Sequence, residues 1–227
     1  MLVIAIDGAC RRNGKPNCVA SGGLFVQQYD DITGYLIRTE TLSTYEVQST
    51  NQRGELIALK EALAYILSVK ESAHIVTDSE YLFNTMTKEW FVGWASNEWK
   101  TSTLSPVKNS DLWQVIAEFY TECKRSDIEV TFYHIKGHCV PFGKVTACSL
   151  LSADNTGKSL YYAVLKKYDL VIRTTRTEAI NNANELSMRN NGFYLPLDKL
   201  KEFISINTVA DAIATKCVDA ADALMSK

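Results

Sequence analysis

Short apolar runs alternate with longer stretches of helical spacing along this 227-residue chain. Near the start, three runs share a β-branched, apolar character that predicts strands: LVIAID, SGGLFVQQYD and GYLIRTETLS. The turn-like DDITG separates the last two, so we expect an antiparallel three-stranded meander. The next stretch, NQRGELIALKEALAYILSV, has apolar residues at helical spacing and predicts a helix capped by Thr50 or Asn51.

The remainder of the chain continues this alternation. Two further runs predict strands: HIVTD and IEVTFYHIK. Three stretches predict helices: SEYLFNTMTKEW, DLWQVIAEFYTECK and NTVADAIATKCVDAADALM. Asn109 or Ser110 is the expected cap of the second of these helices. The order of elements indicates an α/β protein with a mixed sheet that has antiparallel and parallel parts.

One long segment does not fit this order. About sixty residues separate KGHCVPFGK from INTVADAIA, and they contain three stretches that predict short helices: SLYYAVLKKYDLVIR, RTEAINNANELSMRN and LPLDKLKEFI. A structureless loop of that length is improbable inside a compact domain. We therefore predict one domain formed by residues 1–140 and 205–227, with a helical insertion or subdomain over residues 141–204.

Composition narrows the class of protein. Hydrophobic residues make up 46% of the chain and the formal net charge is -2, so nucleic-acid binding requires a local basic patch. No run reaches the roughly 18 apolar residues of a membrane span, and Asp7 ends the N-terminal apolar run before it could serve as a secretory signal. The six cysteines form no CxxC pair. We expect a cytoplasmic, monomeric protein with reduced thiols and no membrane partner.

Three acidic residues occupy comparable places in the predicted elements. Asp7 is expected to end the first strand, Asp78 ends HIVTD, and Glu55 lies near the first turn of the first long helix. If the two strands are neighbours, Asp7 and Asp78 lie side by side, and carboxylates that close repel one another unless a cation joins them. Magnesium prefers such oxygen ligands, and two ions about 4 Å apart can support phosphodiester cleavage. Each acid alone is more typical of a turn or a helix cap.

The motifs around these acids, IDGACRRN, STNQRGELIALKEAL and TDSEY, resemble those of type 1 ribonuclease H, which cuts RNA in RNA–DNA hybrids. EWFVGWASNEWKTSTLSPVKNSDLWQ is similar to the tryptophan-rich basic protrusion of the bacterial enzymes, and FYHIKGHC to the family's strand ending in KGH. The resemblance covers residues 1–140 and resumes at 207–225. It implies a mixed five-stranded sheet, three strands antiparallel and then parallel ones, flanked by helices.

The resemblance also implies a function. The chain is expected to be an endonuclease that hydrolyses the RNA strand of RNA–DNA hybrids with two Mg²⁺ ions, or Mn²⁺ in their place, leaving 3′-OH and 5′-phosphate ends. Asp7, Glu55 and Asp78 correspond to metal ligands. His138 corresponds to a loop histidine that assists proton transfer or product release, while His134 on the strand before it is taken as an ordinary strand residue.

The fourth carboxylate of the family has two candidates in this chain. The family pattern N-x-x-A/C-D-x-x-A is met throughout only by NTVADAIA, which makes Asp211 the preferred residue, at the expected start of the last helix. Asp154 lies nearer to His138 in sequence but lacks the flanking asparagine and alanine. The neighbouring Asp219 and Asp222 are interpreted as a solvated helix face.

Substrate contacts follow from the same resemblance. Asn13, Asn51 and Glu80 correspond to residues that line the minor groove, where the 2′-hydroxyl distinguishes RNA from DNA. Thr50 corresponds to a contact with a DNA-strand phosphate. Glu80 stands where a well-studied bacterial form has glutamine, and a glutamate cannot donate to a base edge. Arg11 and Arg12 either approach a phosphate or form a solvated turn.

The protrusion is expected to contact the hybrid backbone through four residues: Lys88, Trp90, Lys100 and Lys108. Most of its other tryptophans are expected to be core anchors. Since its lysines are few, hybrid binding is expected to be modest and strongly salt-dependent.

Other functions remain open at this point. A catalytically silent ribonuclease-H-like module that binds nucleic acid or protein, and an integrase or transposase core, share the fold. The complete set of acids argues against the first, and the protrusion and KGH loop argue against the second. HIKGHCVPFGKVTAC matches no common zinc spacing. SADNTGKS lacks the first glycine of a phosphate-binding loop, because Ser152 occupies that position.

Overall fold

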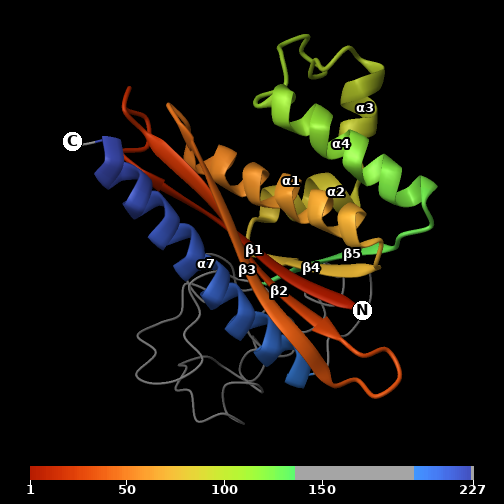
Figure 1. Ribbon diagram of the computed structural model, residues 1–227. Helices are drawn as coiled ribbons and strands as arrows, with labels where there is room; N and C mark the ends of the chain where they lie inside the picture. The colour runs from red at the N-terminus through yellow and green to blue at the C-terminus, as the bar shows by residue number, and fades with distance from the viewer. Residues whose placement is uncertain (136–196, 226–227) are drawn as a thin grey trace, which may run out of the picture.

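The computed structural model of the chain describes residues 1–135 and 197–225, and its strands form a single five-stranded sheet in the order β3-β2-β1-β4-β5 (Figure 1). The strands are β1 (Leu2–Arg11), β2 (Val19–Tyr29), β3 (Leu36–Val47), β4 (Ala73–Thr77) and β5 (Val130–His134). The pairs β1–β2 and β2–β3 are antiparallel, whereas β1–β4 and β4–β5 are parallel. The predicted mixed five-stranded sheet is therefore confirmed.

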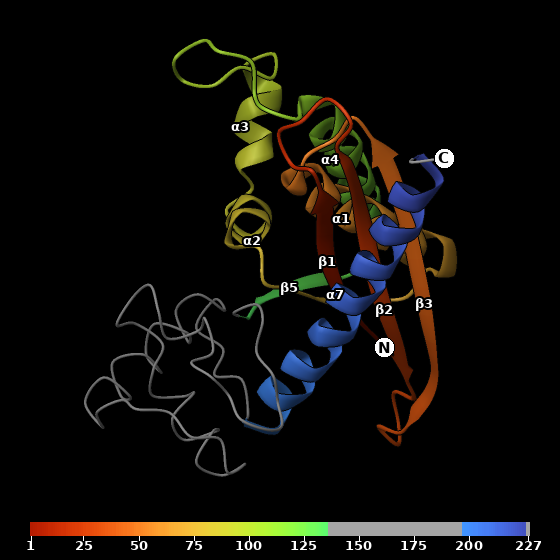
Figure 2. The ribbon, with the colours of Figure 1, turned by 90° about the vertical axis from the view of Figure 1, so that its left-hand side faces the viewer.

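Helices cover both faces of this sheet, as Figures 1 and 2 show. They are α1 (Asn51–Val69), α2 (Glu80–Thr87), α3 (Trp90–Ser96), α4 (Ser110–Arg125) and α7 (Leu197–Met225). α1 packs on one face and α4 packs on α1, while α7 crosses β1, β2 and β3 on the other face. None of the helices among the described residues is long and apolar enough to cross a membrane.

The sequence of α1 explains its position. Thr50 caps the helix, because its hydroxyl accepts a hydrogen bond from the Arg53 amide at 3.4 Å. Leu56, Leu59 and Leu63 are fully buried at helical spacing, against the apolar side of β1. This stripe fixes which side of α1 faces the sheet, and with it the direction in which Glu55 points.

Two neighbouring glycines on β2 allow helices to approach the sheet closely from both sides. A Cβ atom on Gly22 would lie 2.6 Å from the backbone nitrogen of Ala58 in α1. A Cβ atom on Gly23 would lie 2.5 Å from the backbone nitrogen of Ala214 in α7. Successive residues of a strand face opposite sides of the sheet, so the pair places α1 and α7 directly above and below β2.

Two predicted boundaries are wrong. β1 continues past Asp7 to Arg11, because its ladder with β2 extends to the Arg11–Val19 pair, so Asp7 lies inside the strand. α7 begins at Leu197 rather than at residue 207, so Asp211 lies inside the helix and not at its start. The stretch expected to form a separate short helix is the beginning of α7. Phe203 and Ile204, which belong to this stretch, are buried.

Candidate active site

Three carboxylates converge beside the middle of the sheet. Asp7 comes from β1, Asp78 directly follows β4, and Glu55 comes from α1. The parallel register pairs Ile6 of β1 with Thr77 of β4. Asp7 and Asp78, the residues that follow them, therefore lie side by side. One oxygen from each of the three carboxylates lies within 4.8 Å of the others. The structure therefore brings together the three acids that the sequence singled out.

Gly8 allows Glu55 to approach Asp7. A Cβ atom on Gly8 would lie 2.4 Å from the Glu55 backbone nitrogen and 2.7 Å from the Gly54 carbonyl carbon. Only a residue without a side chain fits this contact between strand and helix. The Gly8 amide also donates a hydrogen bond to Asp7 Oδ1 at 2.7 Å, which orients that carboxylate.

The electrostatics of the cluster favour a bound cation. Burial, followed by the charges of Asp78 and Asp211, raises the pKa of Asp7 to about 8, against a small opposing effect of the Gly8 amide. Burial, followed by the charges of Asp7 and Asp78, raises the pKa of Glu55 well above its usual range. Burial and mutual repulsion therefore disfavour the ionised form of both carboxylates, and a bound cation would offset this cost.

The donor set also fits a hard divalent cation. Glu55 Oε2 is buried and has no hydrogen-bond partner among the described residues. A buried carboxylate oxygen without a partner is costly unless a ligand occupies the position in front of it. All the converging ligand atoms are oxygens, which suits Mg²⁺ or Mn²⁺ rather than a soft metal.

Asp211 comes from α7, on the face of the sheet opposite α1, and it lies near this cluster. Asp7 pairs with Gly23 across β1 and β2, and a Cβ atom on Gly23 would lie 2.6 Å from the carbonyl oxygen of Ala210. Asp211 is the next residue, and its charge raises the pKa of both Asp7 and Glu55. The competing Asp154 and the loop histidine His138 lie outside the described residues.

The expected minor-groove residues gather at the start of α1 and the start of α2. The Asn51 amide donates to Asn13 Oδ1 at 3.4 Å, which joins the turn after β1 to the first residue of α1. Thr50 caps the same helix. Glu80 is the first residue of α2, one residue beyond Ser79 and close to Asp78 in the chain. Asn13, Thr50 and Asn51 therefore lie together at the start of α1, the helix that carries Glu55, and Glu80 lies two residues after Asp78.

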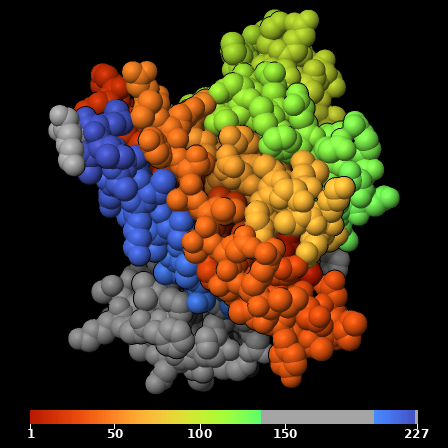
Figure 3. All heavy atoms as spheres, in the orientation of Figure 1, coloured from red at the N-terminus to blue at the C-terminus, as the bar shows by residue number. Residues whose placement is uncertain are grey.

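The protrusion consists of α3 and the segment that leads to α4, and it stands out from the body at the top of Figure 3. The Lys88 ammonium lies over the Trp90 ring, 5.5 Å from its centroid, and Trp90 is 40% exposed. Lys108 is exposed. Lys100 is paired with Glu98 at 2.5 Å, which reduces the net positive charge there.

Trp113, in contrast, is fully buried and donates its indole N–H to the Tyr81 hydroxyl at 2.8 Å. Trp94 packs against it with ring centroids 5.7 Å apart. These two tryptophans hold the protrusion on the body, as expected for core anchors.

The turn after β1 is attached to α7 by two ion pairs. Arg11 Nε donates to Asp219 Oδ1 at 2.6 Å, and Arg12 forms a bidentate pair with Asp222. Asp219 is exposed, as expected for a solvated helix face, whereas Asp222 is only partly exposed. Arg11 and Arg12 are ion-paired to these acids, and their approach to a phosphate stays a prediction. Partners separated by about 200 residues leave no signal in the local sequence. The two ion pairs attach the turn that carries Asn13 to α7.

Two free thiols lie close together beside this turn, Cys10 near the end of β1 and Cys18 just before β2. The Sγ atoms of Cys10 and Cys18 lie 2.8 Å apart, and both cysteines are free. Cys123 and Cys217 are likewise free thiols. Cys139 and Cys148 lie outside the described residues.

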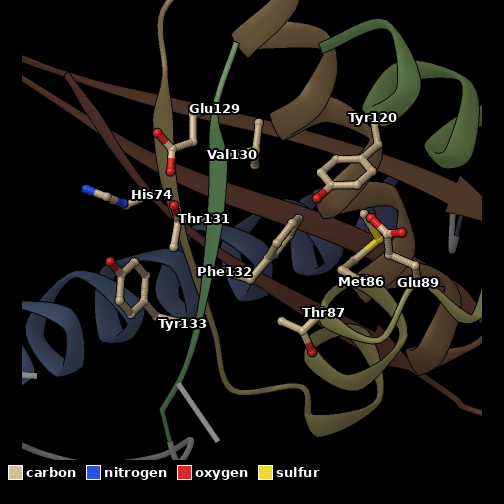
Figure 4. Close-up of a pocket in the computed structure, with 10 residues that line it drawn as sticks. All are labelled: His74, Met86, Thr87, Glu89, Tyr120, Glu129, Val130, Thr131, Phe132 and Tyr133. Carbon is tan, nitrogen blue, oxygen red and sulfur yellow. The ribbon is translucent and has the colours of Figure 1, made fainter. Parts of the chain in front are cut away.

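A pocket of about 380 Å³ lies along β5, away from the acids (Figure 4). Figure 4 shows His74 and Tyr133 on one side of this strand and Tyr120 and Met86 on the other. None of the carboxylates of the cluster lines this pocket, so the cluster is the better candidate for the functional site.

Comparison with known proteins gives the family. The family model described as RNase H matches residues 1–153. A protein named Ribonuclease H from Jannaschia sp. is 38% identical over 152 residues, covering 67% of this chain and 89% of the relative. Another Ribonuclease H, from Clostridium botulinum strain Hall, is 34% identical over 137 residues, covering 60% and 83% of the two chains.

Among solved structures, LC9-RNase H1, described as a type 1 RNase H with the type 2 active-site motif, has a TM-score of 0.52 and 23% identity. The match covers 61% of this chain and 64% of that one, and it agrees with the fold described above. On the family match and the curated relatives together, the chain belongs to the ribonuclease H family.

Proposed function

We propose that this ribonuclease H hydrolyses the RNA strand of RNA–DNA hybrids with two divalent metal ions, Mg²⁺ or Mn²⁺. The single observation that carries the proposal is the convergence of Asp7, Glu55 and Asp78 within 4.8 Å, with Glu55 Oε2 buried and unpaired among the described residues. The relatives named Ribonuclease H support the same reaction.

In this proposal, Asp7, Glu55, Asp78 and Asp211 hold the ions. Bound divalent ions lower the pKa of a coordinated water and neutralise charge that develops on the phosphate oxygens. The chain supplies ligands that are already in place: the Gly8 amide orients Asp7, and the contact at Gly8 fixes Glu55. Water attack on phosphorus leaves 3′-OH and 5′-phosphate ends, and His138 assists proton transfer or product release.

Substrate recognition is proposed at the starts of α1 and α2. Asn13, Asn51 and Glu80 contact the minor groove, where 2′-hydroxyls identify the RNA strand, and Thr50 lies near a DNA-strand phosphate. Phosphate contacts add affinity that falls as salt rises. They are assigned to the protrusion residues Lys88, Trp90, Lys100 and Lys108.

A comparison of substrates tests this assignment. The wild-type chain is incubated in Mg²⁺ with one sequence prepared as an RNA–DNA hybrid, as double-stranded RNA and as double-stranded DNA, with each strand labelled in turn. We expect cleavage of the RNA strand of the hybrid alone. Equal cleavage of either homoduplex, or cleavage of the DNA strand, would contradict the proposed specificity.

The fourth ligand gives a separate prediction. Asp211→Asn removes a charge that acts on both Asp7 and Glu55. We expect it to raise the Mg²⁺ concentration for half-maximal cleavage by about tenfold or more, by analogy with losses at metal sites. Asp154→Asn is the matched variant, and it should leave the Mg²⁺ titration unchanged. The reverse result, a large effect at Asp154 and none at Asp211, would assign the ligand to Asp154.

A further inference from the structure

A buried histidine contacts the backbone of the proposed ligand Asp78. His134 is the last residue of β5 and is 5% exposed. Its Nε2 atom lies 3.2 Å from the backbone carbonyl oxygen of Asp78. A carbonyl oxygen can only accept a hydrogen bond, so Nε2 carries the proton and donates.

The position of Asp78 in the sheet explains what this contact supplies. The β4–β5 ladder pairs Thr77 with His134, and the Ile135 amide donates to the Thr77 carbonyl at 3.0 Å. Asp78 is the first residue beyond β4, where the chain turns toward α2. The His134 side chain therefore provides a donor to a carbonyl that lies just past the end of the strand.

Other contacts hold both the turn and the imidazole in place. The Ser79 amide donates to Thr77 Oγ1 at 3.1 Å, and Thr77 is fully buried. The His134 ring packs against Phe83 of α2, with centroids 5.6 Å apart and planes inclined by 35°. The Asp78 carbonyl and the Ser79 amide belong to one peptide group, so the peptide that follows the Asp78 Cα atom is tied to two buried side chains, His134 and Thr77. The peptide before Asp78 is held by the backbone hydrogen bond from Ile135 to the Thr77 carbonyl.

We propose that His134 is a positioning residue for Asp78, and that its hydrogen bond to the Asp78 carbonyl holds the Asp78 carboxylate toward Asp7 and Glu55. An aspartate has only two side-chain torsions, so its oxygens follow a displacement of its backbone closely. Groups that orient metal ligands commonly affect metal affinity and activity by roughly 10- to 100-fold. The inference rests on the proposed metal centre, but it goes beyond it by assigning a role to a residue that is not a ligand.

Two variants separate the hydrogen bond from the packing of the ring. His134→Phe keeps an aromatic ring against Phe83 and removes the donor. His134→Gln keeps a donor, because its amide nitrogen can reach the place of Nε2. His74→Phe is the control, since His74 is a histidine on the neighbouring strand whose ring contacts Tyr133.

The primary readout is the affinity of the whole 227-residue chain for Mn²⁺ in the absence of substrate, measured by electron paramagnetic resonance. Thermal unfolding confirms that each variant is folded. We expect His134→Phe to weaken Mn²⁺ binding about tenfold, with His134→Gln within about threefold of wild type and His74→Phe unchanged. In hybrid cleavage, His134→Phe should lower kcat while KM for the hybrid changes little. If His134→Phe does not fold, His134→Met, which also lacks a donor, takes its place with the same expectation.

Two results would overturn the inference. One is wild-type Mn²⁺ affinity in the folded Phe or Met variant, and the other is an equal loss of affinity in the Gln and Phe variants, which would assign the effect to ring packing. Wild-type protein that binds Mn²⁺ but cuts no hybrid would contradict the proposed function instead. In that case the Mn²⁺ measurements on the variants still decide the role of His134.

Discussion

Asp7→Asn is expected to abolish hybrid cleavage and, in the absence of divalent cations, to increase the free energy of unfolding. Cleavage should fall by at least about a hundredfold, because the variant loses a charged ligand at the centre of the proposed site. Stability should rise because a buried carboxylate beside Asp78 and Asp211 is unfavourable when it is ionised. A substitution that improves stability while it removes activity is the signature of a strained functional site.

The pH dependence of this gain follows from the pKa of Asp7. In the folded protein it is raised from 3.8 to about 8, so between these values the folded state binds more protons than the unfolded state. The contribution of Asp7 to stability is therefore present at low pH and is lost as pH rises from about 4 to about 8. A shift of this size corresponds to at most ~6 kcal/mol, and proton sharing among the acids reduces it to a few kcal/mol.

Denaturant unfolding in EDTA at pH 5 and at pH 8.5 measures this effect. We expect the stability difference between Asp7→Asn and wild type to be larger at pH 8.5. Asp127→Asn, at an exposed aspartate, is the control and should follow wild type at both pH values. Equal stability of Asp7→Asn and wild type at pH 8.5 would show that the acidic cluster is not under electrostatic strain.

Gly8→Ala is the second substitution with a large expected effect. Its Cβ atom would meet backbone atoms of Glu55 and Gly54 at 2.4 and 2.7 Å, and backbone atoms cannot rotate away as side chains can. The start of α1 must therefore move away from β1, at a cost of about 1–3 kcal/mol in folding free energy. Glu55 moves with it, so we expect a higher Mg²⁺ requirement and slower cleavage.

Gly93→Ala is the matched control, because a Cβ atom on this glycine of α3 meets nothing within 4 Å. It should be neutral or slightly stabilising, since alanine favours a helix by about 0.5–1 kcal/mol over glycine. Denaturant unfolding and a Mg²⁺ titration of cleavage compare the two variants. If Gly8→Ala matched Gly93→Ala in both assays, the close approach of α1 to β1 would have no role in placing Glu55.

The local sequence predicted the elements and the acids, because periodicity and strand-end carboxylates are local features. The run LVIAID indicates a strand, but only pairing with β2 extends it to Arg11. The local pattern likewise predicts a separate short helix where the structure has the beginning of α7. Phe203 and Ile204 of this stretch are buried, and their burial depends on the rest of the fold.

Contacts between distant segments could not be predicted in this way. Arg12 and Asp222 are 210 positions apart, and nothing around either residue indicates the other. The local sequence indicates only an ordinary strand residue at His134, because its contact with Asp78 depends on the register that pairs it with Thr77. The Gly8 contact is similar: the glycine lies in an acidic motif, but only the packing of α1 shows which atoms it accommodates.

The most direct test of the central claim is a Mg²⁺ titration of hybrid cleavage by the wild-type chain, with 5′-labelled RNA annealed to DNA and EDTA as the metal-free reference. The account predicts RNA fragments with 3′-OH ends that appear only with Mg²⁺, and none with Asp7→Asn at any Mg²⁺ concentration. Cleavage that persists in EDTA, or that Asp7→Asn supports at the wild-type rate, would contradict it.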